Sequence, residues 1–380
     1  MITVNGKTPV TIQSNHESDA IEQLKELSSK EWVTGTKVVI MPDYHAGKGA
    51  VIGTTVRLGG RVDPMAVGVD IGCAVSAVRI AERDFDPEKL ERIIEEHVPS
   101  GMNIGTFAHD FPAINELIAP VDREYDLRSL GSLGGGNHFL EVDRDSAGHL
   151  WLIVHCGSRH LGVEIAKYHQ KHGDITTKRE KRREIIRSLK EAGREREIEN
   201  ALRNFSVEPF LEGTAFDAYI HDMQIAQAYS QENHRLIENA ILDGMGWHAE
   251  ERIMTMHNYI DTDNMILRKG AVSAQKGEIF LCPMNMHDGT LLCIGKGNPD
   301  WNFSAPHGAG RILSRTNAKA EVSMKEFEES MRGVWSRSVC ESTLDESPFA
   351  YKPMDEILEV IGETAEVVET MKPVFNYKAH

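Results

Sequence analysis

The order of strand-like and helical segments limits the fold of this chain more than any other feature. Apolar, glycine-rich stretches typical of β-strands fill residues 36–82, and strand-like patterns return at 252–297. Between them, residues 161–242 have a mostly helical pattern, and further helices are expected at 309–332 and 354–372. Because strands and helices do not alternate regularly, a doubly wound parallel sheet is disfavoured. We therefore expect an α+β fold with mixed or antiparallel sheets flanked by helices.

No boundary between domains is visible in the sequence. The 380 residues would fit two or three domains of ordinary size, but no repeat, linker or change of composition divides them. We therefore expect one large domain spanning residues 1–380. The 58 acidic residues outnumber the 42 basic ones and give a net charge of −16. This balance argues against a protein that coats nucleic acid through bulk charge, but it allows a local basic site.

The sequence carries no signal for secretion or membrane insertion. The first ten residues, MITVNGKTPV, are polar and lack the apolar core of a signal peptide. No stretch reaches the roughly 18 consecutive apolar residues of a transmembrane helix. Five cysteines without a C-x-x-C pair argue against a disulfide scaffold and a zinc ribbon. We expect a cytoplasmic protein with no membrane partner.

Two histidines stand at the open end of a predicted β-hairpin. The apolar segments HFLEVD and HLWLIVHCGS flank the turn-like sequence DRDSAG. If Val142 pairs with Leu150, His138 lies opposite Val154, one position from His155 and within about 5–8 Å of it. Such a pair can share a metal ion. Alternatively, both histidines only hydrogen-bond to the backbone at the strand ends.

A bend at Gly72 would bring two more candidate ligands together. Asp70 and Cys73 would face opposite sides of a regular strand, so a shared site requires the turn or bulge that a glycine permits. His257 adds another imidazole after the strand-like sequence RIMTM. From ligand type alone, this set favours zinc or iron over manganese, because a thiolate is a soft ligand. Alternatively, Cys73 is a small buried apolar residue.

His307 lies in the small-residue segment APHGAGR, where a helix could begin and a substrate could approach the backbone. Arg311 adds a candidate clamp for phosphate. A neutral imidazole is already nucleophilic at pH 7, so a covalent nucleotidyl-histidine is chemically reasonable. Alternatively, His307 is a structural residue in a glycine turn.

Together, a series of short motifs resembles one known family. They occur in the order found in the RtcB family of RNA-splicing ligases and span the chain from about Pro42 to Lys378. The motifs are MPDYHAGKG, GVDIGCAV, SLGGGNHFLEV, HCGSRHLG, HNYID, RKGAVSA, GKGN, SAPHGAGR and KPVFNYK. The resemblance implies an RtcB-like fold and an enzyme that uses GTP and manganese. Such an enzyme joins RNA 2′,3′-cyclic phosphate or 3′-phosphate ends to 5′-hydroxyl ends, in tRNA splicing or RNA repair.

The resemblance also implies roles for individual residues. The family's ligands for two Mn²⁺ ions, which replace zinc or iron in our expectation, match Asp70, Cys73, His138, His155 and His257, with Cys73 as the bridge. His307 matches the histidine that becomes attached to GMP. The nucleotide-binding residues match Asn137, Glu141, Asn258, Asn285, Thr290, Gly308, Ala309, Gly310, Tyr351 and Lys378. The basic residues for RNA ends and triphosphate oxygens match Arg159, Lys269 and Arg311.

The chain also departs from the family pattern. Cys156 and His160 replace common residues of H-S-G-S-R-G, and the loop PMNMHDGT puts Asn285 where a serine contact is common. Two other activities fit the same residues, namely RNA end capping or repair through a GMP-histidine, and phosphoester hydrolysis at a dinuclear metal site. The complete set of ligands disfavours a scaffold that only binds RNA. We expect RNA ends as substrates, a monomer, and an archease-type activator as a candidate partner.

The stretch 178–203 is locally basic, with ten Lys or Arg and six Glu residues. A solvated helix of mixed charge is the favoured interpretation. The alternative is a contact with the RNA backbone.

Overall fold

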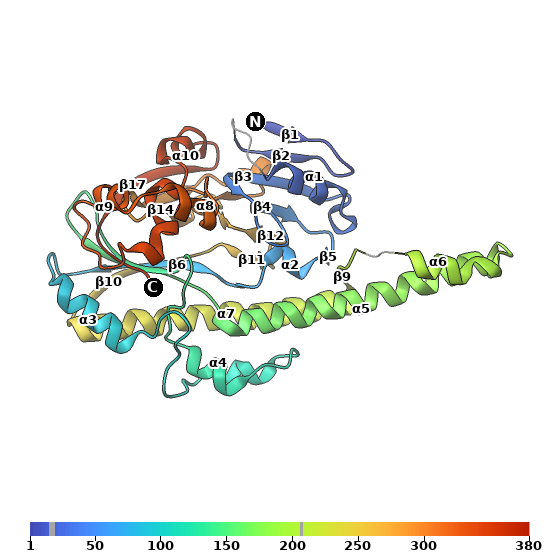
Figure 1. The fold of residues 1–380 in the computed structure, drawn as a ribbon, viewed down its shortest axis with the longest axis horizontal. Coiled ribbons are helices and arrows are strands. Elements are labelled where there is room, and N and C mark those ends of the chain that lie inside the picture. Colours follow the sequence, from blue (N-terminus) through green and yellow to red (C-terminus); the bar gives the residue numbers. More distant parts are fainter. Residues whose placement is uncertain (15–19, 206–207, 380) are drawn as a thin grey trace.

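The computed structural model describes residues 1–14, 20–205 and 208–379, and it confirms the expected α+β fold. Two open sheets, one of six strands and one of seven, form most of the body. Two long helices, α5 and α7, run along one side of this body (Figure 1). Among the described residues, no helix combines the length and the apolar character needed to cross a membrane.

The six-stranded sheet has the spatial order β1-β2-β3-β4-β12-β11. Its strands are β1 (Ile2–Val4), β2 (Val10–Ile12), β3 (Lys37–His45), β4 (Ile52–Arg57), β12 (Ile266–Lys269) and β11 (Asn258–Asp261). Strands β2 and β3 run parallel, whereas the other pairs in this sheet are antiparallel. The sheet is therefore mixed, as expected.

The seven-stranded sheet is antiparallel throughout, in the order β10-β6-β8-β7-β17-β15-β14. Its strands are β10 (Ala249–Met256), β6 (Ala74–Ile80), β8 (Leu150–Cys156), β7 (Phe139–Arg144), β17 (Ala365–Tyr377), β15 (Gly289–Gly295) and β14 (Ile279–Asn285). The remaining strands form two short two-stranded sheets. They pair β13 (Ala271–Ser273) with β16 (Ser304–Pro306), and β5 (Arg61–Val62) with β9 (Leu211–Glu212).

The helices vary widely in length. The α-helices are α1 (Ile21–Ser29), α2 (Pro64–Val67), α3 (Pro87–His97), α4 (Arg123–Ser129), α5 (Arg159–Glu191), α6 (Ile198–Asn204), α7 (Gly213–Met245), α8 (Arg315–Glu321), α9 (Met324–Ser330) and α10 (Met354–Ile361). Short 3-10 helices are η1 (Glu31–Val33), η2 (Pro112–Glu116), η3 (Glu195–Glu197), η4 (Pro299–Trp301), η5 (Glu341–Glu346) and η6 (Pro348–Ala350).

Helix α7 contributes to the cores of both sheets. Its residues Ile237 and Ile241 are buried in a cluster with Leu152 of the seven-stranded sheet. Nearer its start, Tyr219 is buried in the cluster that contains Ile40 of the six-stranded sheet. Each fully buried side chain of this kind contributes about 1.5–3 kcal/mol. Packing against one helix therefore fixes the position of one sheet relative to the other.

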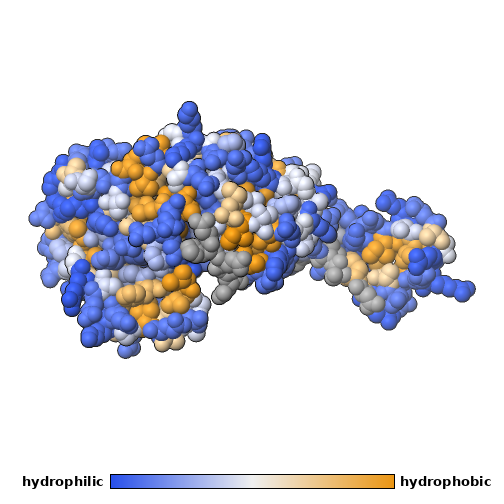
Figure 2. Space-filling model, turned by 90° about the horizontal axis from the view of Figure 1, so that it is seen from above, coloured by the Kyte–Doolittle hydropathy of each residue, from blue (hydrophilic) through white to orange (hydrophobic). Residues whose placement is uncertain are grey.

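The second half of α5 leaves the body and, together with α6, forms a narrow projection (Figures 1 and 2). This projection contains the basic stretch 178–203. Several of its charges pair within the stretch itself, as in Lys181–Glu184 at 2.9 Å and Arg194–Glu197 at 2.6 Å. These exposed pairs support the interpretation as a solvated helix of mixed charge.

The predictions of two helical segments near the C-terminus are partly wrong. The segment 354–372 is helical only to Ile361, and its second half belongs to β17. Residues 366–370, EVVET, contain β-branched side chains suited to a strand, and Pro373 cannot continue a helix. The segment 309–332 contains two short helices, the first of which begins at Arg315.

The predicted hairpin is present as β7 and β8, but its register differs by two residues. Val142 pairs with Leu152 rather than with Leu150. The last pair is Arg144 with Leu150, and the side chain of Asp145 accepts the backbone N–H of His149 at 2.8 Å within the turn 145–149. Because a shift of two residues keeps every side chain on its face, the two histidines still meet at the open end.

Candidate active site

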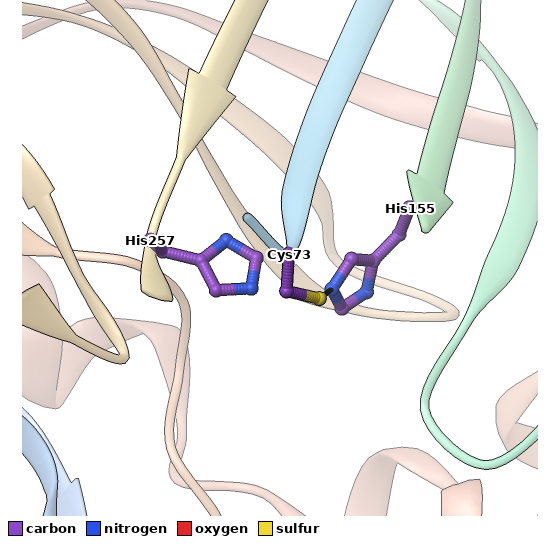
Figure 3. Close-up of side chains that lie close together, drawn as sticks. All are labelled: Cys73, His155 and His257. Carbon is purple, nitrogen blue, oxygen red and sulfur yellow. Dashed lines mark hydrogen bonds between the residues drawn. The ribbon is translucent and has the colours of Figure 1, made fainter. Parts of the chain in front are cut away.

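One end of the seven-stranded sheet gathers four candidate metal ligands. The strands β10, β6, β8 and β7 are neighbours and antiparallel, so the end of one strand lies beside the start of the next. His257 follows β10, Cys73 precedes β6, His155 lies near the end of β8, and His138 precedes β7. Figure 3 shows Cys73 between His257 and His155, each at the end of its strand.

These side chains form two groups that share Cys73. Asp70, Cys73 and His138 form one group, and Cys73, His155 and His257 form the other; within each, the ligand atoms lie within 4.8 Å of one another. The Sγ of Cys73 lies 3.3 Å from Nε2 of His155 and 3.7 Å from Nε2 of His138. All five residues expected to bind metal therefore lie together, and the thiol stands where a bridge between two ions would be.

The bend expected at Gly72 brings Asp70 to this group. The N–H of Cys73 donates to the carbonyl of Asp70 at 3.3 Å, and Gly72 has a φ of +74°. The N–H of Gly72 in turn donates to the carbonyl of Asn258 at 2.7 Å. A turn replaces the strand here, so Asp70 and Cys73 point into one site.

The protonation states of these groups suit a cation. Burial and neighbouring histidines lower the pKa of both His155 and His257, so both are neutral imidazoles, the form that binds metals. Burial opposes ionisation of Asp70, but its hydrogen bond to His138 lowers its pKa to about 2. Burial raises the pKa of the Cys73 thiol, so a thiolate there requires a nearby positive charge. The donor set therefore fits one or two metal ions.

Backbone contacts orient the imidazole of His138. Its Nδ1 donates to the carbonyl of Leu133 at 2.9 Å, which turns Nε2 toward Asp70 at 3.1 Å. The guanidinium of Arg159 lies behind this ring, with one nitrogen 3.4 Å from Nδ1. Arg159 therefore lies beside a candidate ligand.

His307 extends the row of histidine rings. Its ring centroid lies 5.0 Å from that of His257. It follows β16, which pairs with β13, and its backbone N–H donates to Oδ2 of Asp43 at 3.0 Å. The same carboxylate oxygen lies 2.5 Å from Nδ1 of His307. The expected helix start at His307 is wrong, because the next helix begins at Arg315.

Glycines allow the chain to pass close to Asp43. A Cβ on Gly310, which has a φ of +77°, would lie 2.0 Å from the carbonyl oxygen of Asp43. A Cβ on Gly308 would lie 2.8 Å from the carbonyl oxygen of Pro283. A larger residue at position 310 would push the segment away from β3, and one at position 308 would push it away from β14; either change would displace His307.

A cavity opens beside His307. His155, His257 and His307 line one part of its wall. The residues expected to bind nucleotide that also line it are Asn137, Glu141, Asn285, Gly308, Ala309, Gly310, Tyr351 and Lys378, together with Arg311. The cavity therefore connects the candidate nucleophile, the candidate metal ligands and most of the expected nucleotide contacts.

Glu141 lies buried at the wall of this cavity. The side-chain amide of Asn376 donates to its Oε2 at 2.5 Å. Burial is the largest influence and raises the pKa of Glu141 to about 7, although Asp143, Asn376 and Lys378 act in the opposite direction. Small changes of pH near neutrality therefore change the charge at this point of the cavity.

Glu346 also lines this cavity and links three cations. Its carboxylate lies 2.8 Å from Nζ of Lys378, 3.1 Å from Arg311 and 2.5 Å from Arg315. It also accepts the hydroxyl of Tyr351 at 2.7 Å. Burial by itself disfavours the charged form, but the three cations lower the pKa of Glu346 to about 2. The carboxylate therefore fixes the side chains that face the cavity.

Comparison with known proteins identifies the family. The family model described as tRNA-splicing ligase RtcB matches residues 23–123 and 115–379. This chain belongs to the RtcB family. The RNA-splicing ligase RtcB of Escherichia coli K12 is 30% identical over 401 residues, which cover 94% of this chain and 93% of the relative. The tRNA-splicing ligase RtcB of Aeropyrum pernix is 24% identical over 432 residues, covering 88% and 86%.

Three residues that match functional positions of the RtcB family do not line this cavity. Two of them hydrogen-bond to the backbone, and the third is buried in a strand. Asn258 donates to the carbonyl of Asp70 at 3.3 Å and accepts the N–H of Gly270 at 2.9 Å. The Nζ of Lys269 donates to the carbonyl of Lys48 at 2.5 Å, and burial lowers its pKa to about 8. Thr290 is fully buried in β15. A structural role explains these contacts directly.

Sequence reasoning missed three residues of the RtcB site. Asp43 lies in MPDYHAGKG and Asn376 in KPVFNYK, motifs that were recognised without assigning a role to either residue. Glu346 lies five residues before Tyr351 in a segment without a recognised motif. The role of such a buried carboxylate can be inferred only when the cations around it are known.

Proposed function

We propose that this protein is a GTP- and Mn²⁺-dependent RNA ligase. It would join RNA 2′,3′-cyclic phosphate or 3′-phosphate ends to 5′-hydroxyl ends through a GMP–His307 intermediate, in tRNA splicing or RNA repair. Membership of the RtcB family and the names of the relatives support RNA ligation. The observation that carries the chemical proposal is the position of His307, which is held by Asp43 beside the metal-capable residues and a cavity.

The metal-capable residues divide naturally between two ions. Asp70 and His138 would bind one Mn²⁺ and His155 and His257 the other, with the thiolate of Cys73 shared by both. When bound, such ions offset negative charge on a phosphate that is being transferred. Five protein ligands arranged around a shared thiol support the dinuclear form of the site.

Asp43 prepares His307 for attack. The carboxylate accepts the Nδ1 proton of His307, so the lone pair of the ring lies on Nε2. Nε2 would bond to the α-phosphorus of GTP while the bond between that phosphorus and the β-phosphate oxygen breaks, releasing pyrophosphate. The covalent intermediate divides one difficult condensation into easier steps.

The cavity offers contacts suited to guanine. An ionised Glu141 can accept hydrogen bonds from N1 and N2 of guanine, which adenine cannot donate. Lys378 and Tyr351 at the same cavity would contact the nucleoside, and the small residues of the HGAG segment would allow its phosphate to approach the backbone. This pattern favours GTP over ATP.

Transfer to RNA would follow. Water first opens the cyclic phosphate by breaking its bond to the 2′ oxygen, which leaves a 3′-phosphate and a 2′-hydroxyl. An oxygen of that 3′-phosphate attacks the phosphorus of GMP, and the bond to His307 breaks. The 5′-hydroxyl then attacks the activated 3′-phosphate, and GMP leaves. Arg159, which lies beside His138, is the residue we propose for contact with the RNA end.

An RNA-joining assay tests the proposal. The protein is incubated with GTP, Mn²⁺ and two RNA fragments, one ending in a 2′,3′-cyclic phosphate and the other beginning with a 5′-hydroxyl. We expect a joined product that depends on GTP and is absent with His307→Ala. A 3′ end that carries GMP but is never joined would indicate end capping. Loss of phosphate without any need for GTP would indicate a hydrolase.

A further inference from the structure

A second cluster of metal-capable side chains lies where α4 meets the start of α5. Nδ1 of His160 lies 3.3 Å from Oδ1 of Asp126 and 3.4 Å from Oε2 of Glu164. One ligand atom from each residue lies within 4.8 Å of the other two. Asp126 comes from α4, whereas His160 and Glu164 are four residues apart on one face of α5.

One of the two carboxyl oxygens of Asp126 lacks the partner that a buried charge requires. Its side chain is fully buried, and within the described part of the chain Oδ2 has no hydrogen-bond partner. Burial, followed by the facing carboxyl of Glu164, raises the pKa of Asp126 to about 8. Two carboxyl groups in this position need a cation or a shared proton between them.

The surrounding contacts hold the residues of this cluster in place. The hydroxyl of Tyr229 donates to the carbonyl of Asp126 at 2.5 Å, and the N–H of Asp122 donates to Glu164 at 3.0 Å. The ring of Tyr125 packs edge-on against His160, with centroids 5.0 Å apart. The cluster is therefore fixed by its neighbours, independently of any ion.

We propose that Asp126, His160 and Glu164 bind a divalent cation, with Zn²⁺ as the best-fitting ion. The imidazole and the two carboxylates are ligand types that Zn²⁺ binds, and three protein ligands leave the fourth tetrahedral position open. The side chain of His160 is 42% exposed, so water or a ligand can reach that position. Zn²⁺ also binds nitrogen and oxygen donors more tightly than Mn²⁺ does.

The proposed site is separate from the cysteine–histidine groups but lies near them. It borders a second cavity whose wall includes Tyr125, His160 and Arg159, together with Asp70 and His138. A cation here would add positive charge beside the cavity that His138 also lines. His160 is also one of the departures from the common RtcB pattern, so the site would be a feature of chains that carry this histidine.

Zinc titration of the full chain tests the proposal. Protein treated with a chelator is titrated with ZnCl₂ by calorimetry, comparing the wild type with His160→Ala, Glu164→Gln and the control His172→Ala, an exposed histidine on the same helix. We expect each of the two site variants to bind one zinc ion fewer per chain than the wild type. The control should bind the same number as the wild type.

Co²⁺ distinguishes this site from the one that contains Cys73. A cysteine ligand adds a sulfur-to-cobalt charge-transfer band, whereas Asp126, His160 and Glu164 contribute ligand-field bands alone. We expect His160→Ala to lose ligand-field intensity while the charge-transfer band stays. Equal zinc stoichiometry and equal cobalt spectra for wild type and both site variants would overturn the proposal and assign a shared proton to the carboxyl pair.

Discussion

Oδ2 of Asp43 contacts both the backbone N–H and the Nδ1 of His307, at 3.0 Å and 2.5 Å. The two residues lie 264 positions apart in the chain and meet because β3 and β16 belong to neighbouring ladders. One carboxylate thus fixes both the position and the tautomer of the candidate nucleophile. In the proposed mechanism, Nε2 is therefore the ring nitrogen that attacks.

Replacing Asp43 by Asn should slow formation of the GMP–protein adduct by at least about 100-fold, because the amide no longer holds the reactive tautomer. The rate is measured under single-turnover conditions with labelled GTP. Binding of GMP, followed by calorimetry, should change by less than about threefold, since Asp43 does not line the cavity. An unchanged adduct rate in a folded variant would contradict the role assigned to Asp43.

Replacing Cys73 by Ala should reduce the affinity for both proposed Mn²⁺ ions, because each group of ligands includes this thiol. We expect each affinity to fall by at least about 100-fold, measured by calorimetry or by electron paramagnetic resonance of free Mn²⁺. Cys282→Ala removes an equally buried thiol from another core and provides the matched control. Loss of only one ion in Cys73→Ala would argue against a shared ligand.

Binding of guanine nucleotides should weaken as the pH falls through 7. The pKa of Glu141 is raised to about 7, so its accepting, ionised form is lost below that pH. Between pH 8 and pH 6 the Kd for GMP should rise about tenfold. Glu141→Gln should bind GMP weakly at pH 8 and lose most of this pH dependence. The same pH dependence in both proteins would show that another group is responsible.

Replacing Glu346 by Gln should lower the free energy of unfolding by about 3 kcal/mol, because three cations lose a buried partner. The pKa of this carboxyl lies at about 2, below its ordinary value of 4.5. Its contribution is therefore complete above about pH 4.5 and is lost as the pH falls toward 2. Urea unfolding should show a constant difference in the free energy of unfolding between wild type and Glu346→Gln from pH 7 down to about pH 4.5, and a smaller difference at pH 4. A difference below about 1 kcal/mol at pH 7 would contradict this account.

The fold class was predicted from the sequence, and the five residues that the family resemblance implied as metal ligands lie together in the structure. Gly72 indicated the bend between Asp70 and Cys73. The predicted hairpin correctly placed His138 near His155, although the predicted pairing of its strands was wrong by two residues. A shift of two residues preserves the face of each side chain, so the functional prediction did not depend on the precise pairing.

What the sequence left undetected depends on contacts between distant segments. Asp43 gains its role from a partner more than 250 residues away. Glu346 gains its role from cations in two other segments, Arg311 and Arg315 in one and Lys378 in the other. The helix predicted over 354–372 includes the first part of β17, because that part carries charged residues common in helices, such as Glu366 and Glu369. In that case the pairing with β7 and β15 outweighs local propensity.

Covalent labelling by GTP tests the central claim most directly. The protein is incubated with Mn²⁺ and GTP labelled at the α-phosphate, denatured, separated on a gel and digested for mass spectrometry. The account predicts one GMP per chain on His307, in a linkage that acid breaks and alkali does not, and no label in His307→Ala. Absence of label from the wild type, or label that persists in His307→Ala, would contradict it.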